Sequence, residues 1–148
     1  MAGKLTNYAA NAILDELTGR TNTLNFSDVY VGLSTTEPTA SGTNINEPTK
    51  GSTTGYNRIL LGSNSSSLTQ LMNAAANGST TNNQIIKFDE VLASWGTLTH
   101  FVLFNSKTGG SALAYGEILN EEGVATPITP AINSMPIIRT GGLTISLT

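Results

Sequence analysis

The feature that most constrains the fold is a series of short segments in which apolar and polar residues alternate. In residues 28–35, Val29, Val31 and Leu33 alternate with small, polar or aromatic residues, which is the period of a β-strand. About eight such segments are separated by turns rich in Gly, Asn and Pro. This pattern is typical of an antiparallel sandwich or barrel, and we predict a mainly β fold with a single antiparallel β-sandwich.

The first 20 residues differ, because their apolar positions have the spacing of one helix face. These positions are Leu5, Ala9, Ala12, Ile13 and Leu17. Thr6 is suited to cap the start of an N-terminal α-helix and Gly19 to end it. The helix either packs on its own domain, which is the favoured interpretation, or acts as an arm that docks on a neighbour.

A length of 148 residues is usual for one domain. We expect a helix or arm in residues 1–20 and a sandwich in residues 28–148, with a long loop at 36–55. Residues 63–83 contain apolar positions at helical spacing among Ser and Asn, which favours a short helix but does not fix the local structure. We expect no signal peptide and no membrane-spanning segment.

The residues predicted to face the core are the inward members of these alternating segments. They are Val29, Val31, Leu33, Ile85, Phe88, Trp95, Phe101, Leu103, Leu113, Tyr115, Leu143, Ile145 and Leu147.

The helix and the loop are the candidate interaction segments, because long loops are usually functional. The residues predicted to contact a partner are Leu5, Tyr8, Ile13, Pro38, Asn44, Ile45, Pro48 and Lys50. We expect a chain that lacks residues 40–49 to fold and to lose its binding to that partner.

Residues that could perform catalysis or bind metal are scarce. His100 is the single histidine and there is no cysteine, so a catalytic triad and a zinc site both lack partners. The adjacent carboxylates Asp89 and Glu90, and Glu121 and Glu122, would point to opposite faces of a strand and make poor shared ligands. We predict no enzyme, no metal and no cofactor.

Charged residues make up 11% of the chain and the net charge is −3, whereas soluble domains average about 25% charged residues. Without a basic surface, nucleic acid is not an expected partner. The neutral polar surface instead suits lasting contacts with other proteins or with copies of the same chain.

The segment "ASWGTLTHFVLFNSKTGGSALAYGEI" resembles a signature of small virion structural proteins of tailed phages, often labelled tail fibre or capsid decoration proteins. The signature residues are Trp95, Gly96, His100, Phe101, Gly109, Gly110, Tyr115 and Gly116. "YAANAILDELTG", "DVYVGLSTTEPTASGT", "GYNRILL" and "GGLTISLT" also resemble parts of that family. We expect the indole N–H of Trp95 to find a backbone acceptor and residues 105–110 to form a turn.

The resemblance implies a non-enzymatic virion component that is made in the host cytoplasm. Two functions stay open. The favoured one is a decoration or cement subunit bound to the major capsid protein or another virion protein. The alternative is a tail-tip or tail-fibre module that recognises a host glycan or protein. A homo-oligomer is expected, with a trimer favoured because decoration proteins commonly sit at three-fold positions of the capsid.

Overall fold

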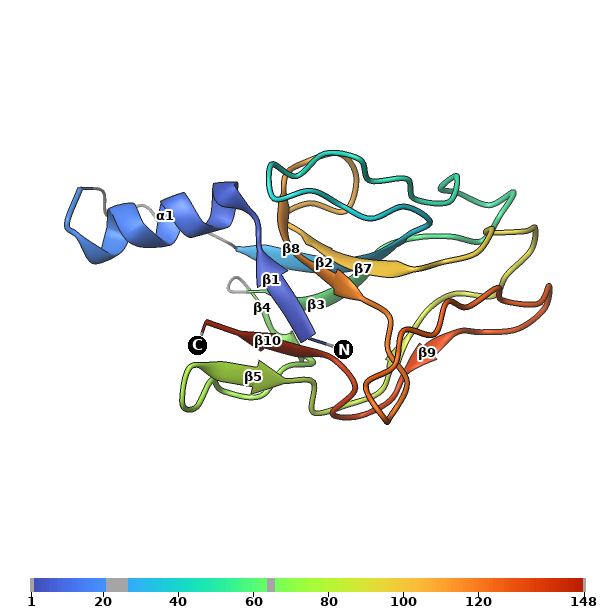
Figure 1. The fold of residues 1–148 in the computed structure, drawn as a ribbon. Helices are drawn as coiled ribbons and strands as arrows, with labels where there is room; N and C mark the ends of the chain where they lie inside the picture. The colour runs from blue at the N-terminus through green and yellow to red at the C-terminus, as the bar shows by residue number, and fades with distance from the viewer. Residues whose placement is uncertain (1, 21–26, 64–65, 148) are drawn as a thin grey trace.

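The computed structural model describes residues 2–20, 27–63 and 66–147, and Figure 1 shows their arrangement. One helix and a series of short strands follow each other along the chain. They are β1 (Ala2–Leu5), α1 (Asn7–Leu17), β2 (Asp28–Ser34), β3 (Ile59–Ser63), β4 (Ser66–Gln70), β5 (Ser79–Thr81), β6 (Ile86–Lys87), β7 (His100–Phe104), β8 (Ala112–Glu117), β9 (Ile137–Ile138) and β10 (Thr144–Ser146). The prediction of a mainly β fold with an N-terminal helix is confirmed.

The strands form one curled sheet of eight strands, in the order β4-β3-β2-β7-β8-β1-β10-β5, and a two-stranded sheet of β6 and β9. Neighbours pair antiparallel except β1 and β10, which are parallel. Leu71 links the two ends of the large sheet, because its N–H donates to Leu61 of β3 and its carbonyl accepts from Asn83, just after β5. The curl encloses the main core between the two sides of the sheet.

Most of the residues predicted to form the core do so. Val31, Leu33, Phe88, Trp95, Phe101, Leu103, Leu113 and Leu143 are buried in the main core, and Val29 and Ile145 pack against it. Tyr115 is also buried, but it belongs to a second cluster on the opposite face of the sheet.

Two of the core predictions are wrong, Ile85 and Leu147. Ile85 is 54% exposed, whereas its neighbour Ile86 is fully buried and pairs with Ile138. Ile85 and Ile86 are adjacent and the strand is only two residues long, so alternation of apolar and polar residues does not show which isoleucine points inward. The prediction chose Ile85, one position too early. Leu147 is 62% exposed, because β10 ends at Ser146.

Residues 63–83 contain β4 and β5, so the short helix predicted there is wrong. β4 occupies Ser66–Gln70, and Asn73 then donates its N–H to Thr81 of β5. Pairing with strands on both sides therefore overrides the helical spacing of the apolar residues.

The loop 36–55 lies against the outer face of the sheet. Val102, Phe104, Ala112 and Tyr115 are buried on this face, and Ile45 of the loop packs against them. The loop is therefore a second covering layer, which is why β7 and β8 are buried on both faces.

A buried ion pair fixes this loop to the sheet. Arg58 Nη2 lies 2.6 Å from Glu47 Oε2, and the two side chains are 4% and 9% exposed. The Tyr56 hydroxyl donates to Glu47 and accepts the N–H of Leu33, both at 2.8 Å. Burial alone would raise the pKa of Glu47, but its hydrogen bonds with Arg58, Lys50 and Tyr56 outweigh burial and hold that pKa below its ordinary value.

The same arginine contacts the turn of the signature segment. Arg58 Nη1 donates to the carbonyls of Ser106 and Gly109, each at 2.8 Å, and its guanidinium lies 3.3 Å from the centre of the Phe104 ring. Removing residues 40–49 would delete Glu47 and leave Arg58 buried without its carboxylate. These contacts argue against the expectation that the deletion variant folds.

Trp95 of the signature segment has the backbone acceptor that the sequence predicts. The indole N–H of Trp95 donates to the carbonyl of Thr54 at 2.8 Å, and its ring packs edge-on against Tyr56. Gly109 and Gly110 have φ values of 59° and 70° in the turn between β7 and β8, a conformation that favours glycine.

Other signature residues lie in or beside β7 and β8, on either side of that turn. Gly96 also has positive φ, at 77°. A side chain at Gly116 would meet the buried ring of Phe101. His100 is partly buried at the start of β7, where its Nδ1 shares a hydrogen bond of 2.8 Å with the Thr99 hydroxyl.

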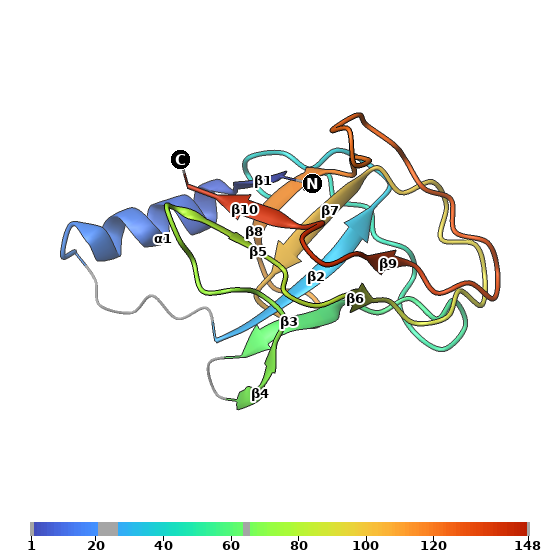
Figure 2. The ribbon, with the colours of Figure 1, turned by 90° about the horizontal axis from the view of Figure 1, so that it is seen from below.

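Helix α1 begins and ends where the sequence predicts. The Thr6 hydroxyl accepts the N–H of Ala9, and Gly19 follows the helix with a φ of 74°. Leu5 belongs to β1, which was not predicted and pairs with β8. This pairing directs α1 away from the sheet in both views (Figures 1 and 2).

Candidate functional site

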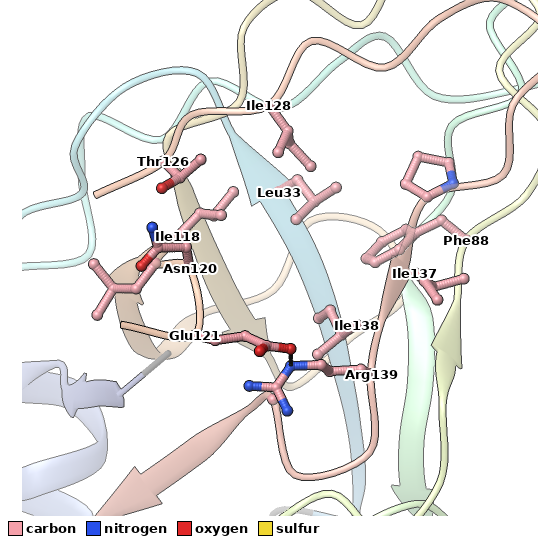
Figure 3. Close-up of a pocket in the computed structure, with 13 residues that line it drawn as sticks. Leu33, Phe88, Ile118, Asn120, Glu121, Thr126, Ile128, Ile137, Ile138 and Arg139 are labelled. Carbon is pink, nitrogen blue, oxygen red and sulfur yellow. Dashed lines mark ion pairs between the residues drawn. The ribbon is translucent and has the colours of Figure 1, made fainter. Parts of the chain in front are cut away.

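A groove of about 410 Å³ lies at the end of the sheet where β8 stops. Its floor is formed by the apolar side chains of Leu33, Ile118, Ile128 and Ile138. Figure 3 shows Asn120 and Thr126 on one wall, and Phe88 and Ile137 on the opposite wall. This volume lies within the range of about 300–1,000 Å³ that is usual for ligand pockets.

The first wall is a tight turn that follows β8. Asn120 Oδ1 accepts the N–H groups of Glu122 and Val124 at 3.0 and 2.9 Å, and Gly123 adopts a φ of 78°. Residues Leu98 and Ile128 then pair through two backbone hydrogen bonds. The wall is thus held by local hydrogen bonds at its tip and by the bridge between Leu98 and Ile128 at its base.

The second wall is β9, and Asn82 holds it in place. Asn82 is 1% exposed, and its Nδ2 donates to the carbonyls of Gln84 and Arg139 at 2.7 and 2.9 Å. Its Oδ1 accepts the N–H of Leu143 at 2.9 Å. One buried amide therefore joins the end of β5 to the β9–β10 turn.

The mouth of the groove carries one ion pair. Arg139 Nε lies 3.3 Å from Glu121 Oε1, and the side chains are 58% and 72% exposed. The dashed line in Figure 3 marks this contact beside the apolar floor. Because exposed ion pairs contribute little to stability, these charges are free to exchange partners with a bound molecule.

The chemistry of the groove is suited to binding. Its lining has no histidine and no cysteine. Across the described residues, no group of three or more His, Asp or Glu side chains is placed to hold a metal ion. The groove can hold an aliphatic or aromatic group, and its two charges can orient that group.

A second apolar surface lies on α1. Tyr8, Leu14 and Leu17 are 51%, 55% and 77% exposed, and Ala9 is the buried residue of the helix. The favoured interpretation, that the apolar face packs on its own domain, is therefore wrong for the far end of the helix. Leu14 and Leu17 lie one turn apart and share a face of the helix.

A family model described as "Podophage GP4 fiber I protein gp80" matches residues 4–137 of the chain. The chain belongs to this family. It is accordingly a phage structural protein of the fibre type, and its place is the virion. No curated protein matches its sequence.

The match to the gp80 fibre family includes α1 and most of the groove's lining, since it runs from Lys4 of β1 to Ile137 of β9. Ile138, Arg139 and Gly142 of the groove lie beyond it. Within the described residues, no helix is long and apolar enough to cross a membrane.

Several residues predicted to contact a partner contact the chain itself. Pro38 and Pro48 are buried, and Ile45 packs on the sheet. Lys50 Nζ lies 2.7 Å from Glu47 Oε2. Asn44 is exposed, but its amide donates to the carbonyl of Glu37 at 2.8 Å.

The three predicted residues at the N-terminus have different surroundings. Leu5 and Ile13 are partly buried, and Tyr8 is exposed. Tyr8 and Ile13 belong to α1, which lies on the side of the molecule opposite β9 in both ribbon views.

Sequence reasoning missed the groove, and it kept the arm interpretation of the helix only as the less favoured alternative. One available signal was the pair Ile137 and Ile138 after Pro136. Two adjacent isoleucines on a strand point to opposite faces, so one of them had to lie outside the core. The groove's other wall comes from residues 118–128. The spacing of residues along the sequence does not show that this wall lies close to β9.

Proposed function

We propose that the protein is a non-enzymatic structural subunit of the phage tail fibre, held in the virion by protein–protein contacts. The observation that carries this proposal is the exposure of Leu14 and Leu17 at the far end of a helix that projects from the sheet. Membership of a fibre protein family supports the tail location. Such apolar exposure is costly in water and is typical of interaction surfaces.

The absence of catalytic function is supported by the surroundings of the single histidine. The Nδ1 of His100 shares a hydrogen bond with the Thr99 hydroxyl. The hydroxyl of its register partner Ser34 donates to the carbonyl of Thr36. The groove lies elsewhere and has no nucleophile paired with a base in its lining.

A role in host recognition has weaker support than a structural role. Glycan and protein recognition often relies on exposed aromatic anchors, whereas Tyr56, Phe88, Trp95 and Phe101 are all buried. Tyr8 is an exposed aromatic side chain, and it lies on α1.

The alternative is a decoration or cement subunit bound to the capsid surface. The projecting helix and the sparse charge of the chain suit attachment to a capsid lattice as well as to a fibre. We expect the chain to self-associate under either proposal, with a trimer as the favoured oligomer.

Copy number and position in purified virions test the location. We expect a small number of copies per particle by quantitative mass spectrometry, and immunogold label at the tail. Hundreds of copies with label over the head would replace the fibre proposal with the decoration alternative.

Incorporation into virions tests the mode of attachment. We expect a Leu14→Gln, Leu17→Gln variant to be missing from particles, because glutamine keeps helix propensity and removes the apolar contact. The matched control is Asn11→Gln, at an exposed polar position of the same helix. Normal incorporation of the double variant would refute attachment through α1.

A further inference from the structure

We propose that the far end of α1 of one copy inserts into the groove of a second copy. The inference rests on the proposed function and deepens it, because it names the partner of both apolar surfaces. The partner is another molecule of this chain, and each molecule then offers one helix and one groove.

The helix supplies apolar groups of suitable size and spacing. Leu14 and Leu17 are more than half exposed and lie about 5–6 Å apart at their Cβ atoms, as expected for residues three apart on a helix. The groove offers about 410 Å³ above an apolar floor. Ile137, 55% exposed on its wall, extends this apolar surface to the rim.

The charges beside the two surfaces are complementary. Asp15 and Arg20 form an exposed ion pair of 3.8 Å at the end of α1. Glu121 and Arg139 form a second exposed pair at the mouth of the groove. When the helix enters the groove, Asp15 can face Arg139 and Arg20 can face Glu121, so neither surface leaves a charge without a partner.

The position of the helix requires two different molecules. In both ribbon views α1 projects on one side of the sheet, whereas β9 lies on the other side (Figures 1 and 2). The helix therefore cannot reach the groove of its own chain. A contact between two different surfaces is head-to-tail, and it closes into a ring or continues as a filament.

Mixing two binding-deficient variants tests this arrangement. Leu14→Gln with Leu17→Gln removes the helix contact, and Ile137→Glu removes the groove contact. We expect the unmodified protein to oligomerise and each variant to be monomeric by light scattering. An equimolar mixture should form a heterodimer and nothing larger, because one helix and one groove remain intact.

The controls are two exposed apolar residues outside the proposed contact. Tyr8→Gln lies at the other end of α1, and Ile132→Glu lies outside the groove. Both variants should oligomerise as the unmodified protein does. Circular dichroism checks that all variants keep the fold.

A charge exchange tests the orientation independently of the apolar residues. Arg139→Glu should weaken self-association about tenfold, because it replaces an attraction with a repulsion of similar size. Adding Asp15→Arg to the same chain should restore most of the loss.

A monomeric unmodified protein at its highest soluble concentration would overturn the inference. So would an oligomer that both contact variants leave intact, or a charge exchange without recovery. If the helix variant self-associates normally but is missing from virions, the inference fails and the proposed function stands. If it also enters virions normally, both fail.

Discussion

Replacing Glu47 with glutamine tests whether the loop 36–55 is part of the fold. Glu47 accepts hydrogen bonds from Lys50, Tyr56 and two nitrogens of Arg58. The glutamine amide would keep the size of the side chain but would place an N–H₂ group where an acceptor is needed. Arg58, 4% exposed, would then be a buried cation without a full counter-charge.

The expected loss follows from these contacts. Breaking a buried ion pair from one side costs about 3–5 kcal/mol. A single charged hydrogen bond contributes about 1.5–3 kcal/mol. Since Tyr56 can still donate to the amide oxygen, we expect Glu47→Gln to lower the free energy of unfolding by about 3 kcal/mol.

Denaturant unfolding followed by Trp95 fluorescence measures this loss. The control is Glu37→Gln, at an exposed position of the same loop, which should change stability by less than about 0.5 kcal/mol. A loss below about 1 kcal/mol for Glu47→Gln, with an unchanged denaturant slope, would refute the view that this carboxylate fixes the loop.

The acid dependence gives a second measurement on the same side chain. The pKa of Glu47 is lowered in the folded protein from an ordinary value of 4.5, so the unfolded chain binds its proton first as the pH falls. Its contribution to stability is complete above that ordinary value and is lost as the pH drops through the folded pKa. Glu47→Gln should lack this component of the acid dependence.

Three further predictions concern other buried polar groups. Burial and the charge of Glu47 raise the pKa of Tyr56 above its ordinary value of 10.0. The free energy of unfolding should therefore fall as the pH rises above that value. Tyr56→Phe should reduce this fall in alkaline titrations. Asn82→Ala removes three hydrogen bonds and should lower the free energy of unfolding in denaturant by about 2–4 kcal/mol. A decrease below about 1 kcal/mol would contradict the role of Asn82 in holding β9. Trp95→Phe removes the indole N–H that donates to the Thr54 carbonyl, while that carbonyl keeps the N–H of Leu92. The loss should be about 1–2 kcal/mol in thermal unfolding, whereas an unchanged melting temperature would count against a role for the indole hydrogen bond.

The sequence by itself determined the local features of this protein. Alternation located the central strands, because side chains on a strand have a period of two. Thr6 and Gly19 bounded α1, and Gly109 and Gly110 marked the turn in the signature segment. These features depend on backbone dihedral angles and neighbouring side chains, which a short segment specifies on its own.

Tertiary structure decided which surfaces are covered and which stay exposed. Glu47 meets Arg58 because the loop folds back across the sheet, and no local pattern specifies that path. The groove joins Leu33, Phe88 and residues 118–142, and their proximity depends on strand order. Helix α1 is amphipathic by sequence, but the pairing of β1 with β8 directs it away from the core. Its exposed leucines therefore follow from the topology, because an apolar face can be buried only where the chain path provides a surface to meet it.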